Sequence, residues 1–195
     1  MLRSATCAAV LTLAAACSSS DDKPAPSQHY RDGGIAFDYP DGWSTHDRPH
    51  ARRAHSLIVN TTRAALLVID IKPPERALTL RAYADSFGAL TRAATPIGKM
   101  GASSFGNIQH IDGYELLVEH FTLTLLNVDV PHTRTYGRMT GPAGVCFLTA
   151  QTADNEKTLV SAGFEEIFAT FECGAPNAAA GPDTAAADSA QQRAH

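Results

Sequence analysis

Apolar and polar residues alternate over several segments of the chain, the period that predicts half-buried β-strands. The first segment, Gly34–Pro40, leads into a turn, and a pair of prolines at 73–74 ends the third. Glycines and a proline at 141–144 separate the last two segments and predict a hairpin. The strands expected after the first are Ser56–Thr61, Ala65–Lys72, Tyr114–Asn127, Thr133–Thr140 and Val145–Thr152, and the weakly patterned stretch 99–112 is expected to add a strand or two.

Two other segments repeat their apolar residues every three or four positions, which is the spacing of an amphipathic helix. The first runs from Leu78 to Ala94, where a proline and a glycine follow. The second begins at Asp154, which is placed to cap it, and continues through residue 171. Its apolar stripe is expected to pack on the sheet rather than to line a ligand site; the stripe consists of Val160, Phe164, Ile167, Phe168 and Phe171.

This order of elements predicts an α+β fold, in which two main helices pack on an antiparallel sheet of about six to seven strands. The folded unit is expected at 32–173, a common size for a single domain. Residues 174–195 are rich in Ala, Pro, Asp and Gln without any periodicity, so a disordered tail is expected there.

The first 17 residues resemble the signal sequence of a bacterial lipoprotein. Arg3 precedes an apolar stretch of about a dozen residues, which is too short to span a bilayer. The stretch ends in Leu-Ala-Ala-Ala-Cys at 13–17, similar to a lipobox. The resemblance implies a signal peptide at 1–16 and acylation of Cys17, for example with palmitate, which makes the membrane a partner through the anchor. The alternative is an ordinary cleaved signal that leaves Cys17 as an incidental thiol.

The residues after Cys17 bear on the location of the protein. Ser18 stands where lipoproteins retained in the inner membrane typically have Asp, so the resemblance implies the outer membrane, facing the periplasm, of a Gram-negative cell. In a cell with a single membrane, the anchor would hold the protein on the outer face of that membrane. Residues 17–31 contain serines, charges and two prolines but little to bury, which predicts a flexible tether.

Composition and motifs exclude several other classes of protein. The chain has 195 residues, of which 44% are hydrophobic and 18% charged, as in globular proteins. Its formal charge of −4 argues against a nucleic-acid partner. The sequence contains no Gly-x-Ser-x-Gly elbow, phosphate-binding loop or dinucleotide fingerprint, so no catalytic residue and no cofactor is expected.

The folded part resembles PsbP-like and DcrB-like domains. Three features carry the resemblance: the first strand with the Pro-Asp-Gly-Trp turn at 40–43, the helix after the proline pair, and the ending Phe-Leu-Thr-Ala at 147–150 with a helix that closes at Phe171. The likeness covers most of 34–172. It implies the α+β fold and a binding, adaptor or assembly role in the cell envelope, with no shared catalytic set to transfer.

A dense polar cluster follows the first strand. Its imidazoles could meet at a metal ion, but three arginines in the same stretch repel a cation, so no metal is expected. A basic loop in contact with an acidic partner or anionic headgroups is the functional alternative to a plain solvated loop. Trp43 is expected to pack at the margin of the sheet, with ligand stacking as its alternative. The candidate partner-binding loop therefore comprises Trp43, His46, Arg48, His50, Arg52, Arg53 and His55.

Two cysteines remain outside the signal region, Cys146 and Cys173. Between them the last strand rises about 20 Å and the last helix returns about 24 Å, which brings the two cysteines level. An exported compartment permits a disulfide between them. Two alternatives stay open, since Cys146 could face the other side of the sheet or be a buried core thiol.

Together, these observations predict a lipid-anchored, non-enzymatic module that binds a protein partner in the envelope. One alternative is an immunity lipoprotein that occludes a toxin delivered into the periplasm, which a neighbouring toxin gene would favour. The other is an envelope enzyme without a recognisable motif, which loss of activity on changing one polar residue would favour.

Overall fold

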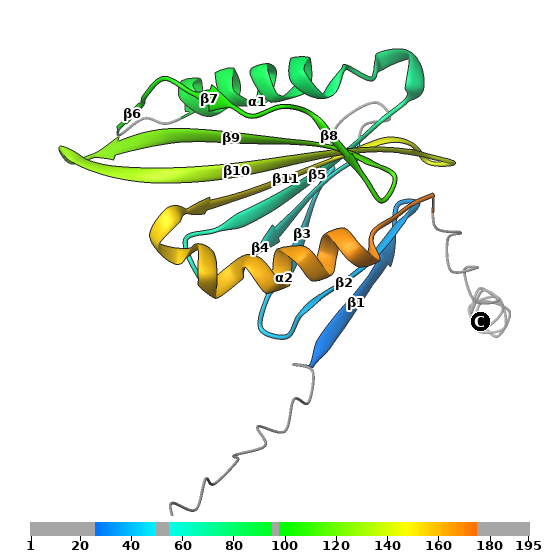
Figure 1. Ribbon diagram of the computed structural model, residues 1–195. Coiled ribbons are helices and arrows are strands. Elements are labelled where there is room, and N and C mark those ends of the chain that lie inside the picture. Colours follow the sequence, from blue (N-terminus) through cyan, green and yellow to red (C-terminus); the bar gives the residue numbers. More distant parts are fainter. Residues whose placement is uncertain (1–25, 50–54, 95–97, 175–195) are drawn as a thin grey trace, which may run out of the picture.

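The computed structural model describes residues 26–49, 55–94 and 98–174. Within these ranges the backbone forms a large and a small antiparallel sheet and two α-helices (Figure 1). In spatial order, the large sheet consists of β3 (Ser44–Pro49), β4 (His55–Asn60), β5 (Leu66–Lys72), β11 (Gly144–Ala153), β10 (Val128–Gly141), β9 (Tyr114–Leu125) and β6 (Lys99–Met100), and β7 (Ser104–Phe105) and β8 (Gln109–Ile111) also pair with β9. The small sheet has the order β1 (Ser27–Asp32), β2 (Ile35–Pro40) and β12 (Glu172–Cys173).

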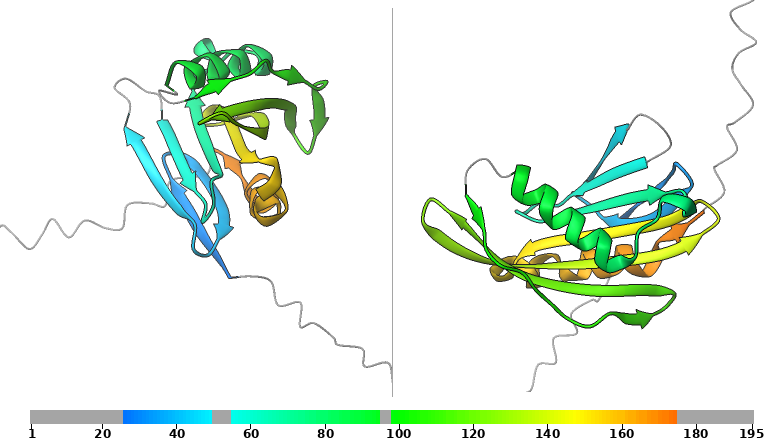
Figure 2. Two further views of the ribbon diagram at one scale, coloured as in Figure 1. Left: turned by 90° about the vertical axis from the view of Figure 1, so that its left-hand side faces the viewer. Right: turned by 90° about the horizontal axis from the view of Figure 1, so that it is seen from above.

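The two helices lie on opposite faces of the large sheet. Helix α1 (Leu80–Ala94) follows a 3-10 turn at Pro74–Arg76 and covers one face. Helix α2 (Lys157–Thr170) follows a 3-10 turn at Asp154–Glu156 and covers the other face together with the small sheet (Figures 1 and 2). The central strand β11 is covered on both sides, and all its residues from 144 to 150 are buried. A strand in this position has a continuous apolar run instead of an alternating one.

Each face of the large sheet has its own core. The core beneath α2 and the small sheet includes Phe37, Leu57, Leu67, Ile69 and Ile167, none of which exposes any surface. The core beneath α1 includes Leu80, Tyr83, Ala84, Leu117 and Phe147. Burial stabilises each large apolar side chain by about 1.5–3 kcal/mol, so both helices are fixed on the sheet by packing.

The α+β class, the antiparallel sheet, the two helices and the hairpin at 141–144 are confirmed. The large sheet has more strands than expected because short segments, β6, β7 and β8, add to β9. The expected cap at Asp154 is wrong. Its carboxylate instead accepts a hydrogen bond from the Thr133 hydroxyl at 2.6 Å, and the α-helix begins only at Lys157.

The expected tether is too long at its C-terminal end, because residues 27–31 belong to β1. Strand β1 pairs along its whole length with β2, from Ser27 opposite Pro40 to Asp32 opposite Ile35. Strand β1 lies at the edge of the small sheet and most of its residues are exposed, so apolar and polar residues do not alternate along it. The side chain of Tyr30 packs on the core, where its ring stacks on that of Phe37 with the centroids 5.1 Å apart. The predicted signal peptide, Cys17 and the tail at 175–195 lie outside the described residues.

The candidate partner-binding loop is largely a hairpin. Residues 44–49 form β3, which pairs with β4 from Ser44 opposite Asn60 to Pro49 opposite His55. The expectation of a loop is wrong for these residues. One side of an edge strand faces solvent and has polar residues, so its sequence is as polar as that of a loop. His46 is exposed on this strand, and Arg48 and His55 belong to the paired strands. His50, Arg52 and Arg53 lie outside the described residues.

Trp43 packs as the structural interpretation predicts. Its side chain is 8% exposed, and its ring meets the edge of Phe164 on α2 at a centroid distance of 5.4 Å. Gly163 makes this approach possible, since a Cβ there would lie 2.6 Å from the Trp43 ring. Trp43 is therefore part of the core and not part of a partner-binding surface.

A disulfide joins Cys146, near the start of β11, to Cys173 in β12, with the two Cα atoms 6.2 Å apart. Strand β12 pairs with β2 through Cys173 and Ile35. The bond therefore connects the large sheet to the small sheet at the end of α2.

Candidate functional site

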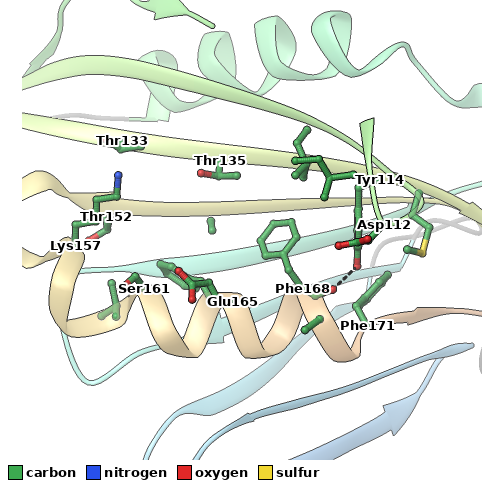
Figure 3. A pocket seen from close by; sticks show the side chains of 17 residues that line it. Asp112, Tyr114, Thr133, Thr135, Thr152, Lys157, Ser161, Glu165, Phe168 and Phe171 are labelled. Atoms are coloured by element: carbon green, nitrogen blue, oxygen red, sulfur yellow. Dashed lines mark hydrogen bonds between the residues drawn. The ribbon is translucent and has the colours of Figure 1, made fainter. Parts of the chain in front are cut away.

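A groove runs between α2 and the outer half of the large sheet. It encloses about 580 Å³, within the range of ligand-binding clefts in proteins. Its walls are α2 on one side and β9, β10 and the β8–β9 turn on the other (Figure 3). Most of the surface exposed in the groove is apolar. The lining side chains used below are Asp112, Tyr114, Leu116, Thr133, Thr135, Met139, Ala150, Thr152, Lys157, Val160, Ser161, Phe164, Glu165, Phe168 and Phe171.

The groove is open because its floor is built from small residues. Alternate residues of β10 and β11 face α2, and among them Thr133 pairs with Thr152 while Thr135 pairs with Ala150. These two cross-strand pairs lie side by side on the floor. Four larger side chains at these positions would fill the space, as large apolar residues do beneath the neighbouring part of α2.

One end of the groove is aromatic. Tyr114 donates a hydrogen bond from its hydroxyl to the backbone carbonyl oxygen of Phe168 at 3.0 Å, and the two rings lie 5.6 Å apart. Burial raises the pKa of Tyr114, so the phenol stays neutral and remains a donor. Phe168 can approach β10 because residue 137 is Gly, where a Cβ would lie 2.6 Å from the Phe168 ring.

The predicted apolar stripe of α2 has two roles. Val160, Phe164, Ile167 and Phe171 are buried against the sheet and β2, as predicted. All of the stripe except Ile167 also lines the groove, so side chains that pack on the sheet also border open space. When the apolar stripe of a helix is wider than the contact between helix and sheet, the side chains at the edge of the stripe face the adjacent groove.

The other end of the groove is polar. Lys157 lies at the first turn of α2, and its side chain is exposed (Figure 3). The hydroxyl groups of Thr133, Thr152 and Ser161 lie near it. The Thr133 hydroxyl donates a hydrogen bond to Asp154, and its oxygen lies 3.1 Å from the Nδ1 atom of His120.

A second polar cluster lies on the opposite face of the sheet, beneath α1. Arg134 and Glu119 are joined at 2.9 Å and are 0% and 1% exposed. Tyr136 donates to Glu119 at 2.6 Å, Ser103 donates to the other carboxylate oxygen, and Gln151 accepts two bonds from Arg134. The guanidinium carbon also lies over two rings, 4.4 Å from the centroid of Phe121 and 5.1 Å from that of Phe87. The groups of this cluster satisfy one another.

The described residues of the predicted partner-binding loop do not line the groove. Strands β3 and β4 occupy one edge of the large sheet, whereas the groove lies beneath β9 and β10 near the other edge. Within the ranges 26–49, 55–94 and 98–174, no group of three His, Cys, Asp or Glu side chains could hold a metal ion. No helix in those ranges has the length and apolar character needed to cross a membrane.

The chain matches no protein-family model, and no curated protein is significantly similar to it. Among solved structures, it is similar to cyanobacterial PsbP (CyanoP) from Synechocystis sp. PCC 6803, with a TM-score of 0.53 and 17% identity over 80% of this chain and 97% of that one. A second similar structure is PA94 of Pseudomonas aeruginosa, a protein of unknown function, with a TM-score of 0.36 and 13% identity over 73% of this chain and 93% of that one. A third is LpqN, involved in cell envelope biogenesis of Mycobacterium tuberculosis, with a TM-score of 0.34 and 15% identity over 74% of this chain and 90% of that one. The likeness to CyanoP shows that this chain has a PsbP-like fold, as expected from the sequence.

Proposed function

We propose that this protein is a non-catalytic binding module of the cell envelope, anchored by lipid at Cys17, that holds an extended ligand in the groove between α2 and the sheet. The signal-like sequence at 1–17 supports the anchor and the exported location. The PsbP-like fold provides the frame in which α2 and the sheet form the groove walls.

The groove is the single observation that carries this proposal. Both faces of the large sheet are covered by a helix, and on the α2 face small floor residues leave about 580 Å³ open to solvent. Packing without gaps is the rule in protein interiors, and an open apolar cleft is a typical site for a ligand.

The cluster beneath α1 favours a binding role over a catalytic one. Ser103, Glu119 and Tyr136 are residue types that enzymes use, but here they bond to one another and to Arg134 in a packed interior. A catalytic group must reach a substrate atom at hydrogen-bond distance. These groups instead form contacts that fix α1 and the segment before β7 on the sheet, through Arg134 against Phe87 and through the hydrogen bond from Ser103 to Glu119.

Site-specific photo-crosslinking in living cells tests the proposal. A photoreactive amino acid with a short aliphatic diazirine side chain, which is too small to fill the groove, is placed at Ser161, which lines the groove, or at Ser86, an exposed serine on α1 that serves as the matched control. We expect an adduct, detected by intact-mass spectrometry of the purified protein, at 161 and not at 86. Equal labelling at the two positions, or none at 161, would contradict the proposal.

A further inference from the structure

The chemical character of the groove changes along its length. At one end, Tyr114, Phe168 and Phe171 form an aromatic wall. Leu116 meets Gly137 beside Tyr114 and Phe168, and Met139 meets Gly113 in the turn before Tyr114. At the other end, the lining consists of hydroxyl groups and the ammonium group of Lys157. A ligand that complements both ends has a polar head and an apolar tail.

The dimensions of the groove favour a single chain. Between Lys157 and Phe168 the axis of α2 advances about 16 Å, at 1.5 Å per residue. On the floor, β10 advances about 20 Å between Thr133 and Met139. A cleft of this length with a volume of about 580 Å³ is narrow, so its occupant is elongated and not disc-shaped.

The charges around the groove indicate the sign of the head group. Lys157 forms no ion pair with any described residue, so its ammonium group is available to a ligand. Glu165 is exposed on the rim eight residues further along α2, about 12 Å away along the helix axis. Asp112 lies at the aromatic end, whereas the Asp154 carboxylate lies at the same end as Lys157, where it accepts the Thr133 hydroxyl. An anionic head beside Lys157 therefore avoids Glu165 and Asp112.

We infer that the groove binds a single-chain anionic amphiphile, such as a fatty acid. Its carboxylate lies beside Lys157 and the Ser161 hydroxyl, and its hydrocarbon tail extends past Phe164 to the wall formed by Phe168 and Tyr114. This inference rests on the proposed function, because it names the ligand class of the same groove.

Calorimetric titration of the chain from Ser18 to His195 tests the inference, since this chain retains every described residue and has no acyl anchor that could compete. The probes share a dodecyl tail and differ in the head: dodecanoate, dodecanol and dodecyltrimethylammonium, each below the concentration at which it forms micelles. We expect dodecanoate to bind with one-to-one stoichiometry and more tightly than either of the other two.

Two pairs of variants locate the ligand. Lys157→Gln should weaken dodecanoate binding by about fivefold, the upper end for an exposed ion pair, and leave dodecanol unchanged. Lys99→Gln is its matched control, because Lys99 is exposed on β6 outside the groove. Thr135→Phe from the floor and Ser161→Phe from the helix should each abolish binding of both probes, and circular dichroism verifies that each variant is folded.

The outcomes separate this inference from the proposed function. Dodecanoate binding that both Phe variants abolish and Lys157→Gln weakens supports the inference. Absence of binding, binding that persists in folded Phe variants, or equal affinity for the ammonium probe would overturn it. Adducts at position 161 in cells that prove to be protein, with no dodecanoate binding in solution, would overturn the amphiphile and leave the groove as a binding site.

Discussion

A buried ion pair joins Arg134 on β10 to Glu119 on β9 beneath α1, and replacing its members tests how much the pair contributes to stability. The variants are Glu119→Leu, Arg134→Met and the double replacement. Both native side chains are buried, so each single replacement leaves one charge in the interior without its partner. The double replacement removes both charges together.

The buried geometry sets the magnitude of the expected effects. Breaking a buried ion pair by removing one partner costs about 3–5 kcal/mol, because the other charge stays desolvated. The double replacement avoids that penalty and leaves only neutral groups without partners, chiefly the Tyr136 hydroxyl, at about 1–3 kcal/mol. We therefore expect the double variant to be more stable than either single variant.

Urea unfolding of the chain from Ser18 to His195, followed by circular dichroism with the disulfide intact, measures these free energies. The pair Arg138 and Glu115 is the matched control, because it joins the same two strands at 3.1 Å but is partly exposed. Arg138→Met should cost no more than about 1 kcal/mol. Additive effects of the two single replacements at 119 and 134, or losses no larger than that of the control, would refute the reasoning.

Three further predictions concern the anchor, the disulfide and the tryptophan. Cys17→Ala should abolish labelling of the protein by a fatty-acid analogue in cells, and label retained in the variant would exclude Cys17 as the acylated residue. The chain from Ser18 should contain no alkylatable thiol under non-reducing denaturation, because Cys146 and Cys173 are bonded; two alkylated thiols would contradict this. Trp43→Ala should lower the free energy of unfolding by about 3–5 kcal/mol, and native Trp43 fluorescence should shift to the red on unfolding. A water-like emission from the folded protein would contradict its burial.

Periodicity alone predicts the strands and helices whose burial differs between their faces. Strand β9 and both helices are found this way, and so is the hairpin between β10 and β11, whose turn contains two glycines and a proline. Periodicity does not predict strands β1 and β3, because each lies at a sheet edge with much of its surface in water. A strand held mainly by backbone hydrogen bonds has no apolar period to detect.

The groove could not be predicted in the same way, because an opening depends on side chains from three elements at once. The sequence nevertheless contains a signal for its floor. Counting outward from the hairpin turn pairs Thr133 with Thr152 and Thr135 with Ala150, so two adjacent cross-strand pairs facing the last helix are both small. Lys157 and Ser161 could have been added, since positions i and i+4 share one face of a helix.

The two faces of β10 differ in what their side chains contribute: one face contributes to the stability of the fold, and the other borders the proposed binding groove. Residues at even positions, Arg134 and Tyr136, point towards α1 and are enclosed by aromatic rings and hydrogen bonds, so changing them alters the free energy of unfolding. The residues at odd positions point towards α2. Thr133 is buried and bonded to Asp154, whereas Thr135 is partly exposed and borders the open space of the groove. Because successive side chains of a strand face opposite sides, neighbouring substitutions should separate the two properties. Thr135→Phe should therefore remove ligand binding at little cost in stability, whereas Arg134→Met should destabilise the fold without changing the groove.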